Sequence, residues 1–207
     1  MNEVTFVRIP KSASSSIYKA LGKANNIRDE RLIPFFLQNK HRYRNLYAPS
    51  HCLLSEAVDL LGFQILEVPS FGVVRNPYSR LESMYRYSKK TNASSLYGGD
   101  SSSLDAFAEG VKALLISDIH FFHAYSQRSY LDLDGQIGVS SVLRFESLQK
   151  DFDAFIAENG LHHLKQTLPH DNGTSTGLKQ GNSASCSPAA KAIVEEIWSE
   201  DFEAFGY

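Results

Sequence analysis

The chain has few cysteines, no long apolar run and no dominant charge among its 207 residues. Cys52 and Cys186 are too few for a disulfide framework and lack metal-ligand spacing, which favours a reducing compartment and predicts a cytoplasmic protein. No apolar stretch or signal-peptide pattern predicts a membrane anchor or export. Because 21 Lys+Arg face 23 Asp+Glu, the net charge is −2 and no overall basic field favours nucleic acid. We therefore expect no nucleic-acid partner and no stable membrane insertion.

The composition is that of one globular domain. Hydrophobic residues make up 43% of the chain and aromatic residues 12%, enough to bury one sizeable core, and the length is short for two domains. We predict a single domain over residues 1–207. Short β-branched and aromatic runs, first at Val4–Arg8 and again at Phe71–Val74, alternate with stretches of helical apolar spacing. This alternation predicts an α/β fold with a mainly parallel central sheet flanked by helices.

Turn residues and apolar spacing predict the remaining elements. Asp134-Gly135 predicts a hairpin turn between Tyr130–Leu133 and Gln136–Val139. Segments rich in Ser, Gly and Asn predict loops at 91–103, which has the features of a lid, and at 172–187. The other expected elements are helices at Cys52–Leu61, Leu104–Ile116 and 148–160, a strand at Val142–Phe145, and one closing helix from Ser187 to Phe205.

The segment from Arg8 to Ser16 joins a predicted strand to a predicted helix. Backbone N–H groups and the positive end of the helix dipole favour an anion at such a junction. Lys11 adds a full positive charge, and Ser14, Ser15 and Ser16 add hydroxyl donors. Serines at a helix start are also helix caps, and a serine cluster without the lysine is more often structural. The glycines that precede the lysine of nucleotide triphosphatases are absent, which disfavours a nucleotide-dependent kinase.

A second junction, from Val73 to Ser83, carries a further candidate for anion binding. Arg75 follows a predicted buried strand, and Ser83 comes eight residues later on the helix that Asn76-Pro77 begins. The planar guanidinium of arginine meets phosphate oxygens with two hydrogen bonds, and a serine hydroxyl supplies one more donor. The structural alternatives are that Arg75 caps a neighbouring helix and that Ser83 is an ordinary surface serine.

Taken together and in this order, the two segments resemble the nucleotide motifs of sulfotransferases that use 3'-phosphoadenosine 5'-phosphosulfate (PAPS). The resemblance implies a P-loop-like three-layer fold and transfer of a sulfonate group from PAPS to a hydroxyl or amine. Residues 142–148 and 201–207 are similar to scaffold segments of the heparan-type 2-O and short bacterial carbohydrate branch, which implies a small-molecule or glycan acceptor. The resemblance implies that the 5'-phosphosulfate is bound by Lys11, Ser12, Ala13, Ser14, Ser15 and Ser16, and the 3'-phosphate by Arg75 and Ser83.

His51 lies between the two motifs, where 2-O members of that branch place a catalytic histidine. The resemblance therefore implies catalytic roles for Lys11 and His51. By itself, a histidine at a helix start is more often a cap or a packing residue. An unperturbed imidazole, with a pKa of about 6.5, is mostly neutral at pH 7 and can accept a proton. Glu56, on the predicted helix that follows, is the competing candidate for the base.

Other polar clusters carry weaker signals. His120 and His123 are one helical turn apart but lack further ligands at a recognised spacing, so we expect packing and no metal site. The basic run Lys40–Arg44 is either a solvated face or a site for an anionic acceptor. Lys179–Gly181 is either a surface loop or a flap over the 3'-phosphate. The alternative functions are a catalytically inactive module that binds PAPS or its product, adenosine 3',5'-bisphosphate (PAP), and, less favoured, a kinase. No oligomeric state is predicted.

Overall fold

The computed structural model describes residues 4–21, 51–92, 102–117, 122–164, 167–168 and 186–207. Contacts within the chain divide it into two compact units. Unit 1 comprises Met1–Val74 and Ser129–Gly177, and unit 2 comprises Arg75–Arg128 and Leu178–Tyr207. A single domain over residues 1–207 stays a prediction.

Unit 1 is built on a parallel sheet of three strands in the described part of the chain. The strands are β1 (Thr5–Val7), β2 (Ser70–Val74) and β5 (Ser141–Arg144), in the order β1-β2-β5. Both pairings are parallel, so the carboxyl ends of all three strands lie at one edge of the sheet. The predicted strands are therefore confirmed, although the last one ends at Arg144, and Phe145 begins a 3-10 turn, η6 (Phe145–Ser147).

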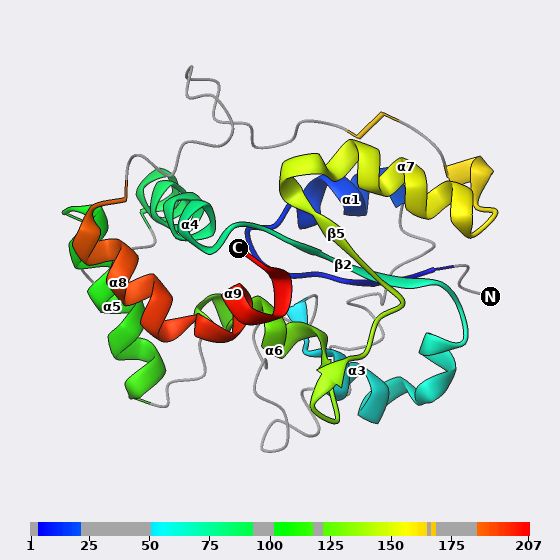
Figure 1. Cartoon of the computed structure of the whole chain (residues 1–207), viewed down its shortest axis with the longest axis horizontal. Coiled ribbons are helices and arrows are strands. Elements are labelled where there is room, and N and C mark those ends of the chain that lie inside the picture. The colour runs from blue at the N-terminus through cyan, green and yellow to red at the C-terminus, as the bar shows by residue number, and fades with distance from the viewer. Residues whose placement is uncertain (1–3, 22–50, 93–101, 118–121, 165–166, 169–185) are drawn as a thin grey trace. The chain divides into compact units, whose positions relative to one another are not determined.

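One face of this sheet carries the aromatic and aliphatic core of unit 1. Helices α1 (Ser14–Leu21) and α7 (Leu148–Glu158) pack on this face, above the strands in Figure 1. Phe71 stacks beside Phe6 with ring centroids 4.9 Å apart and meets Phe155 of α7 at 4.7 Å. The residues of this core are Val4, Phe6, Ile17, Leu21, Phe71, Val73, Leu143, Phe152, Phe155, Ile156, Leu161 and Leu168.

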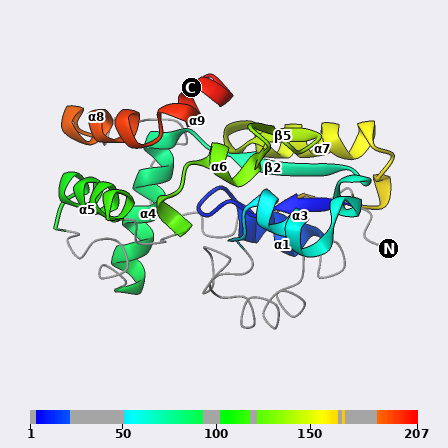
Figure 2. The same ribbon diagram turned by 90° about the horizontal axis from the view of Figure 1, so that it is seen from below.

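Helix α3 (Leu54–Leu61) covers the other side of the sheet in unit 1, and it lies in front when the molecule is seen from below (Figure 2). Close approach explains Gly72 in the middle of β2, because a Cβ there would lie 2.5 Å from the Leu131 side chain. Helix–sheet–helix layering with a parallel sheet confirms the predicted α/β, P-loop-like three-layer fold. The 3-10 turns η3 (Phe63–Leu66) and η7 (His162–Leu164) also belong to this unit.

The predicted hairpin is present but shorter than its apolar pattern suggests. Strands β3 (Asp132–Leu133) and β4 (Gln136–Ile137) pair antiparallel around Asp134 and Gly135, which have φ of 52° and 82°. These positive values are what a tight two-residue hairpin turn requires. Tyr130 and Leu131 belong to helix α6 (Gln127–Leu131) instead of the strand, so that part of the prediction is wrong.

Unit 2 is helical in its described residues: α4 (Pro77–Thr91), α5 (Leu104–Ile116), the 3-10 turn η5 (Phe122–Ala124), α8 (Pro188–Ile197) and α9 (Ser199–Phe205). Helix α5 has the predicted bounds, and its cap Ser103 accepts a hydrogen bond from Ala106 N. Helices α5 and α8 lie side by side in Figures 1 and 2. The core of unit 2 is formed by Leu81, Met84, Phe107, Ala108, Val111, Ala124, Cys186, Ala190, Ile193, Val194 and Trp198.

The predicted closing helix is two helices, not one. Trp198, with φ −127° and ψ 34°, ends α8 and precedes α9. Its buried indole donates a hydrogen bond from Nε1 to Ala124 O at 2.8 Å, a tertiary contact that helical periodicity does not reveal. The central parts of the predicted loops, at 93–101 and 172–185, lie outside the described residues. No described helix is long and apolar enough to cross a membrane.

Candidate functional site

The turn between β1 and α1 has an unusual backbone. Lys11 has φ 66° and Ala13 has φ 59°, a left-handed region that non-glycine residues rarely adopt. The other two non-glycine residues with positive φ in the described chain, Asn92 and Asp134, are types that tolerate it. Two such conformations cost about 1 kcal/mol or more each, and costs of this kind concentrate at binding sites.

The residue at the capping position of α1 has no side-chain acceptor. Ala13 is the residue before the helix, and its carbonyl accepts the first helical hydrogen bond, from Ile17 N at 3.1 Å. A methyl group offers no acceptor to the N–H groups of the first turn, whereas Ser, Thr, Asp or Asn usually stands at this position. A left-handed residue beside right-handed ones also turns successive N–H groups toward one point. The junction therefore suits an anion, as its sequence predicts.

The predicted phosphosulfate residues differ in exposure. Lys11 and Ala13 are half-buried, and Ser15 is exposed. Ser12, Ser14 and Ser16 are buried, with 1%, 8% and 6% of their surface exposed. The two left-handed positions, Lys11 and Ala13, therefore flank the buried Ser12.

His51 is brought to the end of β1 although it is 43 residues away in the sequence. Its Nδ1 lies 2.7 Å from Arg8 O. A carbonyl oxygen only accepts, so Nδ1 carries the proton and Nε2 of the neutral ring carries the lone pair. Arg8 itself is held with its guanidinium 4.6 Å from the centre of the Tyr18 ring. The structure thus gathers Arg8, Lys11 and His51, two cations and one neutral imidazole, around one turn.

The environment of His51 differs from the unperturbed one expected above. Burial, the largest cause, and the neighbouring charges of Arg8 and Lys11 together lower the pKa of the imidazole from 6.5 to about 4, against the hydrogen bond to the Arg8 carbonyl, which raises it. The expectation of an ordinary histidine pKa is therefore wrong, because the sequence shows neither the burial nor the two cations. The ring is neutral at pH 7, with Nε2 able to accept a proton.

Glu56, the competing base, caps its own helix. Its Oε2 accepts a hydrogen bond from Leu53 N at 2.9 Å, and only 8% of the residue is exposed. A carboxylate in this position stabilises the helix start and interacts favourably with the helix dipole. This structural role, which the sequence analysis did not assign, accounts for the residue without catalysis.

In unit 2, the Arg75 guanidinium is oriented by the first turn of α4. Arg75 Nε donates to Ser79 Oγ at 2.9 Å, and Ser79 Oγ donates to Asn76 O at 3.1 Å. Ser83 is half-buried one turn beyond Ser79 on the same helix face. The structure thus connects Arg75 to the face that carries Ser83 through Ser79, a residue that the sequence analysis did not single out.

The start of α4 is capped by Asn76, whereas the capping position of α1 holds Ala13. The side chain of Asn76 accepts hydrogen bonds from Tyr78 N and Ser79 N at 3.1 and 3.3 Å. Pro77, the first helical residue, has no N–H. An anion at this junction must therefore be bound mainly by side chains, which fits the predicted roles of Arg75 and Ser83.

Of the weaker candidates, His123 has packing and backbone contacts, and the others lie outside the described residues. His123 belongs to η5, where its ring meets that of Tyr87 at 6.4 Å and its carbonyl accepts from Arg80. Among the described residues, no group of three or more His, Cys, Asp or Glu could hold a metal ion. His120, the Lys40–Arg44 run and Lys179–Gly181 lie outside the described residues.

Comparison with known proteins identifies the family. The sequence model described as "Sulfotransferase family" matches residues 1–207, the whole chain. No curated protein and no solved structure matches the chain significantly. Since the family match covers both candidate anion-binding junctions, the chain belongs to the sulfotransferase family.

Proposed function

We propose that this sulfotransferase takes its sulfonate group from PAPS and transfers it to a hydroxyl or amine acceptor, with a carbohydrate as the favoured acceptor. The observation that carries the proposal is the junction after β1. There, Lys11 precedes a helix whose capping position holds an alanine, Ala13, in the strained left-handed conformation. A 5'-phosphosulfate has the negative charge and the acceptor oxygens that such a turn requires.

The donor would be bound by the predicted residues of both motifs. Lys11 and the N–H groups at the start of α1 would bind the 5'-phosphosulfate, with the hydroxyls of Ser12, Ser14, Ser15 and Ser16 as further donors. Arg75 and Ser83 would bind the 3'-phosphate. The supporting observation in unit 2 is the hydrogen bond from Arg75 Nε to Ser79 Oγ, which aims the guanidinium along α4. Arginine and phosphate form paired hydrogen bonds, so this motif would anchor the nucleotide away from the reacting sulfur.

In the reaction, an acceptor oxygen or nitrogen would form a bond to the sulfonate sulfur while the bond from sulfur to the 5'-phosphate oxygen breaks. The leaving oxygen keeps the electron pair, and Lys11 would stabilise its growing charge. The acceptor proton would pass to Nε2 of His51, whose other nitrogen is occupied by the Arg8 carbonyl. As with phosphoryl transfer, positioning and charge stabilisation would supply most of the acceleration.

The carbohydrate acceptor rests on sequence resemblance in 142–148 and 201–207, and on the histidine at position 51. A screen with labelled PAPS across simple glycans, glycolipids and phenols tests it. Transfer to a glycan supports the proposal, and transfer to phenols alone would refute the carbohydrate acceptor while leaving the donor intact.

The donor is tested separately by thermal unfolding. A ligand that binds only the folded state raises the melting temperature. PAP should stabilise the protein more than ATP with magnesium does. Stabilisation by ATP and magnesium alone would favour a kinase, and stabilisation by PAP with no acceptor sulfated in any screen would favour the inactive binding module.

A further inference from the structure

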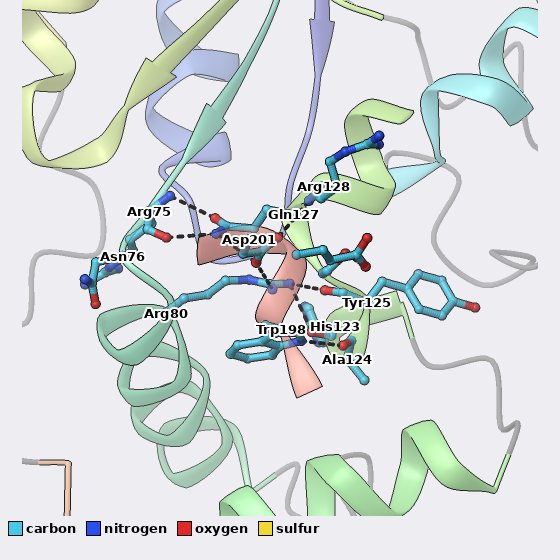
Figure 3. Close-up of polar contacts among 12 residues, drawn as sticks. Arg75, Asn76, Arg80, His123, Ala124, Tyr125, Gln127, Arg128, Trp198 and Asp201 are labelled. Carbon is cyan, nitrogen blue, oxygen red and sulfur yellow. Dashed lines mark hydrogen bonds and ion pairs between the residues drawn. The ribbon is translucent and has the colours of Figure 1, made fainter. Parts of the chain in front are cut away.

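The backbone of Arg75 is held from both sides by one side-chain amide. Gln127 Oε1 accepts a hydrogen bond from Arg75 N, and Gln127 Nε2 donates one to Arg75 O, each at 2.8 Å (Figure 3). The pairing of β2 with β5 ends at Val74, one residue earlier. The amide of Gln127 therefore extends the hydrogen bonding of β2 by one residue, as a neighbouring strand would, to the residue predicted to bind the 3'-phosphate.

The orientation of this amide is fixed by a buried carboxylate. Gln127 Nε2 also donates to Asp201 Oδ2 at 3.1 Å, and both residues are 0% exposed. A carboxylate accepts hydrogen bonds and does not donate them, so the NH₂ group must face Asp201 and Oε1 must face Arg75 N. Asp201 Oδ1 accepts in turn from Arg128 N at 2.8 Å, which ties it to the residue after Gln127.

Arg80 anchors the carboxylate on its other side. Its Nη1 lies 3.9 Å from Asp201 Oδ2, and its Nη2 donates to the carbonyls of His123 and Tyr125 at 3.1 and 2.9 Å. The guanidinium also lies 4.6 Å from the centre of the Trp198 ring. Buried charges are costly unless they are paired and hydrogen-bonded, and these contacts hold the Arg80 guanidinium beside the Asp201 carboxylate.

We propose that Gln127 is a positioning residue for recognition of the 3'-phosphate. It fixes the main chain on both sides of the Arg75 Cα, and Asp201 fixes the amide of Gln127. Ser79 fixes Nε of the same arginine, so the direction of the guanidinium is set from the backbone and from the side chain. This role rests on the proposed function. By holding Arg75 in place, Gln127 would make the site select nucleotides that carry a 3'-phosphate.

The test measures affinity for two nucleotides that differ only in that phosphate, PAP and adenosine 5'-monophosphate (AMP), by calorimetry. The wild type should bind PAP much more tightly than AMP. Gln127→Met, which keeps the volume and removes the hydrogen bonds, should reduce this preference about 10-fold while the AMP affinity is unchanged. With PAPS as substrate, KM should rise by a similar factor and kcat should change little.

The matched control is Ser126→Ala. Ser126 is buried and precedes Gln127 in the sequence, and its Oγ donates to Glu200 Oε1 at 2.6 Å. This variant removes a hydrogen bond between the same two segments, so it should lower the melting temperature and keep the PAP preference. In an Arg75→Ala background, Gln127→Met should cause no further loss of preference, because one interaction cannot be removed twice.

The outcomes separate this inference from the proposed function. A wild type that binds PAP and AMP equally would refute 3'-phosphate recognition itself. A wild type that prefers PAP, together with a Gln127→Met variant of undiminished preference, would overturn the role of Gln127 alone. Should Gln127→Met not fold, Gln127→Glu, which retains the acceptor for Arg75 N, decides: a full PAP preference overturns the inference and a reduced one supports it. If neither variant folds, Gln127 is a scaffold residue and the inference also fails.

Discussion

The two strand-to-helix junctions, both of which we propose to bind an anion, are built in different ways. At the start of α1, the capping position holds Ala13, whose side chain accepts nothing, and the backbone of the turn is left-handed at two positions. At the start of α4, Asn76 caps two N–H groups and Pro77 removes a third. We therefore expect the first junction to bind an anion through main-chain N–H groups and the second through side chains. The difference teaches that the residue at the capping position decides whether the N–H groups of a helix start are occupied by the helix's own cap.

The largest effect should come from removing the charge at the main-chain junction. Lys11→Ala should lower turnover on the order of 1000-fold, because the ammonium group acts on the oxygen that leaves the sulfonate. The fold should survive, since Lys11 is a half-buried turn residue. Steady-state kinetics and a melting curve measure both. Lys19→Ala, on the exposed face of α1, is the control and should retain activity. Near-normal turnover of Lys11→Ala would contradict the role.

His51, the proposed general base, lies beside the turn between β1 and α1. His51→Ala should lower turnover roughly 100-fold with unchanged PAP affinity. Because the pKa of this imidazole is about 4, the ring of the free enzyme is neutral above that pH and becomes protonated below it. Wild-type kcat/KM for the donor should therefore fall on the acid side near pH 4 and not near 6.5.

The acid limb of kcat should lie at a higher pH than that of kcat/KM. A bound phosphosulfate beside Lys11 opposes the positive charges that lower the pKa of His51, so the complex holds a proton more readily than the free enzyme. The two pH profiles check this order, over the range where circular dichroism shows a folded protein. If His51→Ala turns over normally and Glu56→Ala is inactive, the general base is Glu56 and not His51.

At the side-chain junction, the loss should appear in affinity more than in rate. Arg75→Ala should weaken PAP binding about 30-fold and leave AMP binding unchanged, since a charged hydrogen bond to phosphate is lost and nothing at the 5' end changes. Calorimetry measures both constants. Equal loss for PAP and AMP would mean that Arg75 supports the fold and not the 3'-phosphate.

A side-chain acceptor placed at the capping position of α1 should weaken anion binding at this helix start. Ala13→Asp places an acceptor for the first-turn N–H groups at a position where aspartate tolerates positive φ, and it adds a negative charge. PAP affinity should fall about 10-fold or more while the protein becomes more stable to unfolding. Ala13→Gly, which relieves the same backbone without adding an acceptor, should keep its affinity. A tightly binding Ala13→Asp variant would show that the anion is not bound at this helix start.

The smallest effect should come from removing the side-chain cap of α4. Asn76→Ala removes the cap of α4 and should cost about 1 kcal/mol of stability in denaturant unfolding. Asn76→Ser, which restores an acceptor, should recover most of this loss. If Asn76→Ala is as stable as the wild type, the Asn76 side chain does not stabilise the start of α4, and the two helix starts do not differ in this respect.

Several elements of the fold could be predicted because the sequence states them locally. Buried strands such as Phe71–Val74 are apolar on both faces, and α5 has both a capping serine and helical apolar spacing, so its bounds match. The two candidate anion motifs were found by residue type and order. Two predicted element boundaries are wrong because they depend on tertiary packing. The closing helix is interrupted at Trp198, whose indole donates a hydrogen bond to Ala124 O. Residues Tyr130 and Leu131, predicted as the start of the hairpin, belong to α6.

The sequence by itself determined the parallel strand-to-helix pattern and the residues that can bind an anion, because both depend on short-range spacing and side-chain chemistry. Only the tertiary structure decided the state of His51, since its burial and its hydrogen bond come from Arg8, 43 residues away. The same holds for Gln127, which holds the Arg75 backbone across 52 residues. No local pattern encodes such pairings, because a pKa and a fixed side-chain direction depend on which groups the fold brings into contact.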